Sequence, residues 1–241
     1  SGTRARNHLT TFLQTAHPDA RARNVPKLGW HRGAFVLPDT AIGEAGEELI
    51  LQTTGEPPKL RQAGTLAEWR ANVAALAAGN SRVVLAIGAA FAGPLLELVG
   101  EDSGGIHFVG GSSTGKTVTA RAAVSVWGGP EYMQRWRATS NGLEAMAQAH
   151  NDAMLVLDEL AQVEPREAGE VAYMLANGEG KARSRRDGLA KPKASWRLFF
   201  LSTGEVGLAD HMRAAGKRAK AGQEVRLADV PAEHLAGGVA D

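Results

Sequence analysis

The sequence Gly110-Gly111-Ser112-Ser113-Thr114-Gly115-Lys116-Thr117 is the most informative stretch of this chain. These eight residues match the pattern G-x-x-x-x-G-K-[ST] in full. They follow the apolar run Ile106–Val109 and precede a run with helical spacing. A strand, a glycine-rich loop and a helix in this order direct backbone N–H groups and the helix N-terminus at phosphate oxygens. The stretch therefore predicts a P-loop that binds the phosphates of a nucleotide.

Two side chains of this loop have predicted roles of their own. Lys116 is expected to reach the β- and γ-phosphates, and the Thr117 hydroxyl is expected to bind Mg²⁺. ATP and Mg²⁺ are therefore the expected cofactors. The expected nucleotide contacts run through the loop into the helix, at Gly110, Gly111, Ser112, Ser113, Thr114, Gly115, Lys116, Thr117 and Val118.

A serine-hydrolase alternative fits part of the same stretch. Residues 111–115 also match G-x-S-x-G, with Ser113 in the nucleophile position. That alternative does not call for the following Lys-Thr, and His211 is the one loose candidate for the base downstream. It explains less of the sequence than the P-loop does.

Adjacent carboxylates end a second apolar run, Met154-Leu155-Val156-Leu157-Asp158-Glu159. In a P-loop ATPase, Asp158 would hold Mg²⁺ through its water shell and Glu159 would polarise the attacking water. A rigid strand end suits this chemistry, because it fixes both groups near the phosphate loop. One strand–helix unit separates this run from the loop, as in ATPases that carry an additional catalytic glutamate.

A third apolar strand, Trp196–Leu201, precedes Ser202 and Thr203. In such ATPases the strand between the phosphate loop and the acidic pair ends in a polar residue. This residue contacts the γ-phosphate or orients the water. Ser202 or Thr203 would take that place, although either could equally be a helix cap.

Positive charge is concentrated late in the chain. The net charge is +1, yet the segment from Lys181 to Arg226 holds twelve Lys or Arg against four Asp or Glu. Asp187-Gly188 predicts a tight hairpin turn within it. Such a hairpin could grip a phosphate backbone without reading bases, or it could be a solvated loop. Its candidate DNA contacts are Lys181, Arg183, Arg185, Arg186, Lys191 and Lys193.

Arginines near the last predicted strand, Glu224–Leu227, are candidates for a finger that reaches a neighbouring subunit's nucleotide. Such a contact forms in the transition state and can be worth on the order of 10³ in rate. Arg218 is the first candidate and Arg226 the second.

The order of apolar runs predicts an α/β fold. From Ile106 onward, strand-like runs alternate with helical stretches, which is typical of a parallel sheet covered by helices on both faces. We expect a P-loop NTPase with a five-stranded core and a small β-rich N-terminal part. The expected divisions are a β-rich region at 1–62, a helical linker at 63–104 that begins at a capping box of Thr65 and Glu68, and the ATPase core at 105–241.

Composition excludes several other classes of protein. The chain has 241 residues and no cysteine, so a disulfide framework, a zinc ribbon and a thiol nucleophile are excluded. The seven histidines show no metal-ligand spacing. The apolar stretch Val83–Gly100 contains Pro94 and Glu97, so we expect a buried helix or loop and no membrane association. The first residues lack the apolar core of a signal peptide, which favours a cytoplasmic setting.

Together with these motifs, several shorter stretches carry a family resemblance: Trp127-Gly128-Gly129-Pro130, Trp136-Arg137-Ala138-Thr139, Asn141-Gly142-Leu143-Glu144, Leu157-Asp158-Glu159-Leu160, Tyr173-Met174-Leu175-Ala176-Asn177-Gly178, Trp196-Arg197 and Leu201-Ser202-Thr203-Gly204-Glu205. From His8 to about Pro231 the chain resembles domain-of-unknown-function family 927. Proteins of that family occur in prophages and other mobile elements, often beside primase-like modules, and are regarded as ATPases of the AAA+ type.

The resemblance implies an AAA+ core in which Lys116, Thr117, Asp158 and Glu159 take the motor roles above. It also implies that the basic segment corresponds to the presensor hairpin of hexameric replicative helicases, which projects into the central pore. Two departures stand out. The sensor position commonly holds asparagine, and here it holds Ser202 or Thr203. The chain also stops soon after Val230, where a helical lid would normally follow, so we expect the lid to be absent or truncated.

The sequence therefore predicts an AAA+-like motor that couples ATP hydrolysis to movement along DNA, most simply a hexameric replicative helicase of a phage or mobile element. Its expected partners are single-stranded DNA, further copies of itself in a ring and a primase. Two alternatives remain open. One is a nucleotide-gated scaffold or loader that works with a primase, and the other is a P-loop phosphotransferase that acts on a small molecule.

Overall fold

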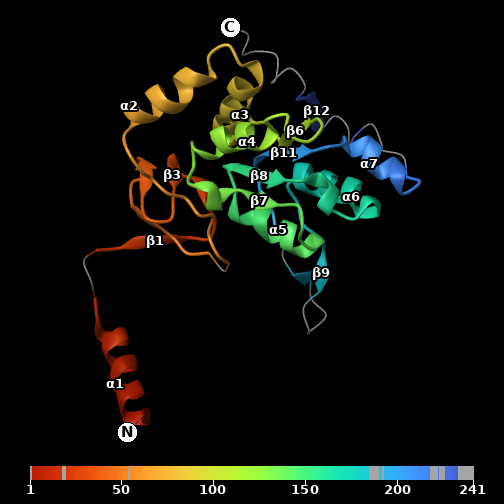
Figure 1. The fold of residues 1–241 in the computed structure, drawn as a ribbon. Coiled ribbons are helices and arrows are strands. Elements are labelled where there is room, and N and C mark those ends of the chain that lie inside the picture. Colours follow the sequence, from red (N-terminus) through yellow and green to blue (C-terminus); the bar gives the residue numbers. More distant parts are fainter. Residues whose placement is uncertain are drawn as a thin grey trace.

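A five-stranded parallel sheet forms the centre of the computed structural model (Figure 1). The structure describes residues 2–17, 20–53, 55–184, 190–191, 193–217, 222 and 226–232. The order across the sheet is β12 (Leu227–Pro231), β6 (Gly104–Val109), β11 (Phe199–Gly204), β8 (Met154–Asp158) and β7 (Gln134–Arg135). This order confirms that a later strand inserts between the strand before the glycine-rich loop and the strand that ends in the acidic pair.

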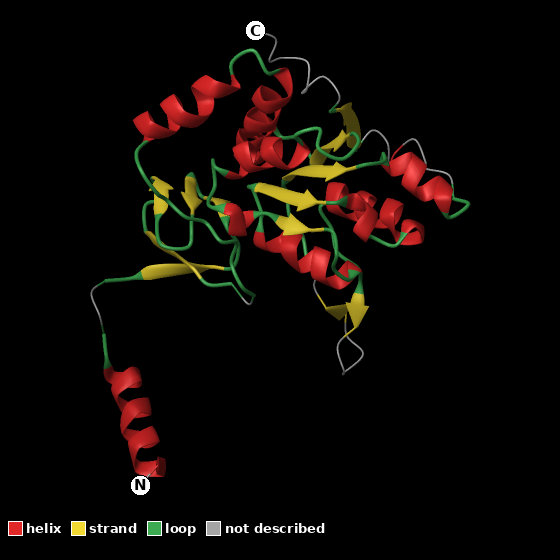
Figure 2. Cartoon of the chain, in the orientation of Figure 1, coloured by secondary structure: helices red, strands yellow, loops and turns green. Residues whose placement is uncertain are grey.

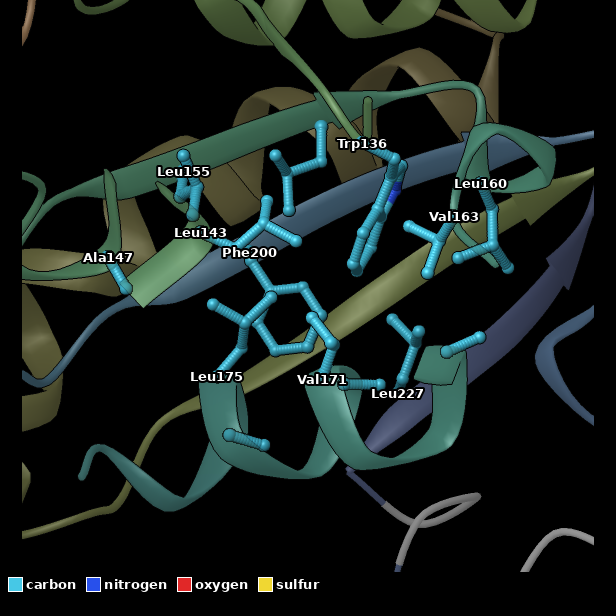
Figure 3. Packing of buried hydrophobic residues seen from close by; sticks show 14 of the residues in the cluster. Trp136, Leu143, Ala147, Leu155, Leu160, Val163, Val171, Leu175, Phe200 and Leu227 are labelled. Carbon is cyan, nitrogen blue, oxygen red and sulfur yellow. The ribbon is translucent and has the colours of Figure 1, made fainter. Parts of the chain in front are cut away.

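Helices cover both faces of this sheet (Figure 2). On one face, α3 (Ser81–Val99) and α4 (Lys116–Val124) pack on Ile106, Phe108, Met154 and Val156. The other face packs against α5 (Ser140–Ala149), α6 (Pro165–Asn177) and α7 (Leu208–Ala214). Figure 3 shows the residues of this second cluster, in which Trp136, Leu143 and Phe200 are fully buried. Two apolar layers thus hold the carboxyl ends of the strands at one edge.

The alternation of side chains along β11 determines which groups face which layer. Ser202 aligns with His107 of β6 and with Leu157 of β8, on the face covered by α5 and α6. Thr203 aligns with Phe108, on the face covered by α3 and α4. Neighbouring residues of a strand point to opposite faces, so two adjacent hydroxyls enter different environments.

The last strands differ in their bounds from those predicted. β11 begins at Phe199, three residues later than expected, and extends through Ser202 and Thr203 to Gly204. β12 begins at Leu227, where the predicted strand ended, because its ladder with β6 pairs Leu227 with Gly105 and Pro231 with Val109. Residues 224 and 225 of the predicted strand lie outside the described residues.

The apolar stretch after the capping box forms the long helix α3. The capping box itself is present, since Thr65 and Glu68 exchange hydrogen bonds at the start of α2 (Leu66–Trp69). Pro94 cannot donate to the carbonyl of Ala90, and the indole N–H of Trp127 bonds to that carbonyl instead at 2.8 Å. The helix therefore continues through its proline.

By length and composition α3 could cross a membrane, which is weak evidence because core helices pass the same test. Ala86, Ala89, Ala90 and Gly93 are buried against the sheet, whereas its outer face is exposed. The stretch is thus a helix buried along one side.

The N-terminal part contains short strands, as expected, but it begins with a helix that the sequence did not predict. This helix, α1 (Gly2–Thr15), has no buried residue and lies apart from the rest of the chain (Figure 1). The strands β2 (Gly29–His31), β3 (Ala34–Val36) and β4 (Ala41–Gly43) form an antiparallel sheet. β1 (Ala22–Val25) pairs in parallel with β5 (Glu48–Leu51).

A buried carboxylate attaches this part to the sheet. Asp152 accepts hydrogen bonds from the backbone N–H of Trp30 at 2.9 Å and from the guanidinium of Arg197 at 2.8 and 2.9 Å. Burial raises the pKa of Asp152, and the bonds from Trp30 and Arg197 oppose that shift. Aromatic rings continue the contact, because Phe35 lies between Trp30 and Trp127.

Candidate functional site

The glycine-rich loop, residues 110–117, connects the carboxyl end of β6 to the first turn of α4. Gly115 caps the helix with φ +83°, a conformation that glycine adopts without strain, and Ser113 has φ +65°. Within the described part of the chain, no backbone N–H from Gly111 to Gly115 has a hydrogen-bond partner. A row of free N–H groups beside a helix N-terminus matches what phosphate oxygens require.

The ammonium group of Lys116 lies over its own loop. Its Nζ donates to the carbonyl of Gly110 at 2.6 Å, to the carbonyl of Gly111 at 2.5 Å and to the Thr114 hydroxyl at 3.3 Å. These acceptors are neutral, so a phosphate group would compete well for the same positive charge. Lys116 is thus held where an incoming phosphate would meet it.

The acidic pair and Thr203 form a hydrogen-bonded group at the carboxyl ends of β8 and β11. The Thr203 hydroxyl donates to Asp158 Oδ1 at 2.5 Å and accepts from the backbone N–H of Glu159 at 3.2 Å. One hydroxyl therefore fixes both the carboxylate of Asp158 and the backbone that carries Glu159. The structure brings these three predicted residues together.

Glu159 adopts an unusual backbone conformation, with φ +66° and ψ +76°. Its carbonyl accepts from Gln162 at 3.0 Å, in the short helical turn that follows β8. A non-glycine residue in this region costs of order 1 kcal/mol, and such strain clusters at functional sites. The conformation turns the chain sharply at the second carboxylate of the acidic pair.

A direct hydrogen bond joins the glycine-rich loop to this group. The N–H of Gly110 donates to the carbonyl of Gly204 at 3.2 Å, directly after Thr203. The loop follows β6 and the acidic pair ends β8, so the two lie on either side of β11, at the carboxyl ends of strands that both pair with it. Open parallel sheets place ligands at this edge.

Ser202, the other candidate at the end of β11, points away from the acidic pair. Its side chain is fully buried, accepts from the indole N–H of Trp136 at 2.9 Å and lies 2.7 Å from Nδ1 of His107. Burial is the main cause that lowers the pKa of His107 to about 4; the bond to the Val206 carbonyl opposes this shift, and the positive charge of Lys116 adds to it. Of the two hydroxyls, only that of Thr203 contacts the acidic pair, at the Asp158 carboxylate and at the Glu159 backbone N–H.

The groups that a serine hydrolase would need do not meet. The Nε2 atom of His211 is bonded to the carbonyl of Val163 at 2.8 Å, and the residue is 7% exposed. This histidine supports the turn before α6 and is not paired with Ser113. The geometry favours the phosphate-binding interpretation of residues 110–117.

The two arginine candidates have different outcomes. Arg218 lies outside the described residues. Arg226 precedes β12 at the amino end of the sheet, stacks on the ring of Tyr173 at 4.8 Å and bonds to Asn177. Its guanidinium is therefore occupied within its own chain, at the end of the sheet opposite the glycine-rich loop.

The basic segment forms a hairpin, of which β9 (Arg183–Ser184) and β10 (Ala190–Lys191) are the paired strands. Arg185 and Arg186, and the side chain of Lys191, lie outside the described residues. Lys193 pairs with Glu179 at 3.2 Å. The exposed side chain of Lys181 has no hydrogen-bond or ion-pair partner among the residues that the structure describes.

Arg183 makes the most extensive contact of this hairpin. Its guanidinium donates to both oxygens of Glu144 at 2.7 and 3.0 Å and to Asn141 at 2.9 Å. Glu144 is 3% exposed and also accepts from the backbone N–H of Lys181 at 3.3 Å. Arg183 therefore anchors the hairpin on α5. The sequence had suggested a phosphate contact for this residue.

The sequence did not predict the buried hydrogen bonds of His107 and Trp136 with Ser202, or the bond of Glu144 with Arg183. A signal existed for the first, since His107 is the one titratable residue in the apolar run Ile106–Val109. The pairing of Glu144 with Arg183 spans 39 positions and had no local signal.

The residues at this edge fit a nucleotide with Mg²⁺. No cluster of three or more His, Cys, Asp or Glu side chains that could hold a metal ion exists in the described part of the chain. An ion here would instead take ligands from nucleotide phosphates, from Thr117 and from Asp158, which suits the reluctance of Mg²⁺ to lose its water. The free N–H groups of the loop could then donate hydrogen bonds to phosphate oxygens.

Comparisons with known proteins place the chain in a family. The model of the family described as domain of unknown function (DUF927) matches residues 2–195. No curated protein matches the sequence.

Two solved structures illustrate the likeness of the fold. The first, described as the active helicase Cch of SCCmec type IV, has 19% identity and a TM-score of 0.70 over 98% of this chain. This chain spans 47% of that helicase. The second, NtrX from Brucella abortus in complex with ATP, has 20% identity and a TM-score of 0.40, over 74% of this chain and 38% of that one. A score of 0.40 is too low to inform the fold.

Proposed function

This chain belongs to the family of the domain of unknown function DUF927, and we propose that it is a P-loop ATPase of the AAA+ type. The observation that carries the proposal is the hydrogen-bonded group of Asp158, Glu159 and Thr203 beside the glycine-rich loop. Backbone donors, a lysine, a threonine and two carboxylates at the carboxyl ends of three successive strands are the parts that phosphoryl transfer to water needs.

Each residue has a role in the proposed hydrolysis. The loop N–H groups and Lys116 bind the phosphates and stabilise the negative charge that develops on them. Thr117 and Asp158 hold Mg²⁺, which when bound supplies a Lewis acid for the phosphate oxygens. Glu159 accepts a proton from the attacking water, and Thr203 orients the Asp158 carboxylate and the backbone of Glu159.

We assign the sensor role to Thr203 and not to Ser202. Thr203 contacts Asp158 directly and holds the backbone of Glu159, so a change at the phosphates would reach both carboxylates through one hydroxyl. Ser202 supports the opposite face of the strand.

A DNA motor is the activity that this ATPase would serve. The fold similarity to a helicase and the basic hairpin support a helicase-like function in a phage or other mobile element. The proposed partners are single-stranded DNA, neighbouring copies in a hexameric ring and a primase. We retain the domain limits 1–62, 63–104 and 105–241, with Arg218 as the candidate finger.

Nucleotide binding by two variants tests the assignment. Lys116→Ala removes the phosphate-binding cation, so binding of a fluorescent ATP analogue should fall at least 10-fold. Glu159→Gln keeps the cradle, so its binding should stay within about 2-fold of the unmodified chain while turnover is lost.

The opposite pattern would contradict these roles. Equal loss of nucleotide binding in both variants would show that Glu159 belongs to the binding cradle. Transfer of phosphate to a small acceptor in preference to water would instead support the phosphotransferase alternative.

A further inference from the structure

We infer that Trp136, Ser202 and His107 form a buried positioning network that fixes Thr203 against Asp158 and Glu159. The inference rests on the proposed ATPase function and extends it to three fully buried residues outside the glycine-rich loop and the acidic pair. Three strands contribute, because Trp136 follows β7, Ser202 lies in β11 and His107 lies in β6.

The direction of every hydrogen bond in this network follows from its ends. The carbonyl of Val206 can only accept, so Nε2 of His107, at 3.0 Å, carries the ring proton. Nδ1 is then an acceptor, and the Ser202 hydroxyl donates to it at 2.7 Å. The Ser202 oxygen in turn accepts from Trp136 Nε1–H at 2.9 Å, because an indole can only donate.

Burial makes each hydrogen bond of this network costly to lose. All three side chains are 0% exposed, so no water can replace a lost partner. A buried polar group without a partner costs about 1–3 kcal/mol, which keeps the three side chains in one arrangement. Burial also lowers the pKa of His107, so the ring stays neutral at neutral pH and Nδ1 remains able to accept from Ser202.

The network holds the chain on both sides of Thr203. Before it, Ser202 is bonded to His107 of β6 and to Trp136, directly after β7. After it, Gly204 packs against the His107 ring so closely that a Cβ atom there would lie 2.9 Å from Cε1. The Gly204 carbonyl also accepts from Gly110 of the glycine-rich loop. Thr203 is therefore placed relative to the loop as well as to the carboxylates.

Steady-state hydrolysis by Ser202→Ala and Trp136→Phe tests the network. Each variant removes the Trp136–Ser202 bond from a different side. A displacement of about 1 Å at a reacting group can cost on the order of 100-fold in rate, so we expect kcat to fall between 10-fold and 100-fold. KM for ATP and nucleotide affinity should change less than 3-fold, because the loop and Lys116 are intact.

Tyr132→Phe is the matched control. The Tyr132 hydroxyl is equally buried and bonds to the carbonyl of Met154, at the end of β8 opposite Asp158. This variant loses a buried hydrogen bond of similar kind, which should lower stability without lowering kcat. Thermal unfolding of all variants separates loss of stability from loss of positioning.

Each outcome decides one claim. If Ser202→Ala and Trp136→Phe lose no more kcat than Tyr132→Phe, the network is merely structural and the inference is wrong. If Ser202→Ala does not fold, Trp136→Phe, which leaves the serine in place, gives the result. If the unmodified chain shows no hydrolysis that depends on Lys116, the proposed function fails, and the inference fails with it.

Discussion

Glu159 is the residue to which we assign the proton transfer, and it is also one of the few non-glycine residues with a positive φ in the described chain. Its φ of +66° is unfavourable for any side chain. The Thr203 hydroxyl and Gln162 hold the peptide units around it. The strained backbone at Glu159 lowers the stability of the fold, and it determines where the Glu159 carboxylate lies.

Replacement of Glu159 by glycine should therefore separate stability from activity. Glu159→Gly relieves the positive φ and should raise the free energy of unfolding by about 1 kcal/mol relative to Glu159→Ala, while hydrolysis is lost in both. Urea unfolding measures the difference. Equal stability of the two variants would mean that the backbone there relaxes when the side chain is removed.

The sequence alone indicated much of the candidate site, because the spacing of the glycines, Lys116 and Thr117 matches a P-loop and the acidic pair ends an apolar run. It could not separate Ser202 from Thr203. Both are hydroxyls at the end of one strand, and only the register with β6 and β8 decides that they face opposite layers. The contact of His107 with Ser202 joins residues 95 positions apart and needs the folded sheet.

At the scale of elements, the hairpin is attached to α5 by a buried acid. Glu144 is 3% exposed and binds both Arg183 and the backbone of Lys181. Gly180 passes so close to Glu144 that a Cβ atom there would lie 2.4 Å from Oε1. The base of the hairpin is thus fitted to this carboxylate.

Removal of the Glu144 charge distinguishes an anchor from a DNA contact at Arg183. If Arg183 is an anchor, Glu144→Gln and Arg183→Ala should each weaken binding of single-stranded DNA by about 10-fold, and the double variant should be no weaker than either. Fluorescence anisotropy at several salt concentrations measures this. Glu179→Gln, which removes the acid of the exposed ion pair with Lys193, is the matched control and should have little effect.

The alternative gives a different pattern. If Arg183 contacts phosphate directly, Arg183→Ala alone makes the slope of log K against log[salt] shallower by about 0.7, because one phosphate contact is lost. Glu144→Gln frees the arginine and does not weaken binding.

The elements were predictable where periodicity and capping agree. The start of α2 follows from the Thr65–Glu68 capping box, and the sheet strands follow from apolar runs. α1 was not predicted, because its apolar residues Leu9, Phe12 and Leu13 are few and remain exposed. The bounds of β11 and β12 depend on their ladders with β6, which no local signal reports.

For the whole molecule, two buried histidines make stability depend on pH. Burial lowers the pKa of both His107 and His150 from the ordinary value of 6.5 to about 4. Between these values the unfolded chain binds protons that the folded chain does not bind. Stability from this source is therefore complete above about pH 6.5 and is lost as the pH falls toward 4.

Urea unfolding at pH 7.5 and at pH 5 should show this loss. Each histidine should contribute about 2 kcal/mol to the fall in the free energy of unfolding. His150→Leu removes one titrating group and should make the fall smaller by about that amount. An equal fall in this variant and in the unmodified chain would assign the dependence to other groups.

We propose that the edge of the sheet with Lys116, Asp158, Glu159 and Thr203 hydrolyses ATP to drive a DNA motor. Phosphate release from ATP by the purified chain, with Mg²⁺ and with or without single-stranded DNA, tests it most directly, with Lys116→Ala measured in parallel. We predict hydrolysis that rises with DNA and disappears in Lys116→Ala. Hydrolysis that persists in Lys116→Ala, or that is the same with and without DNA, would contradict the claim.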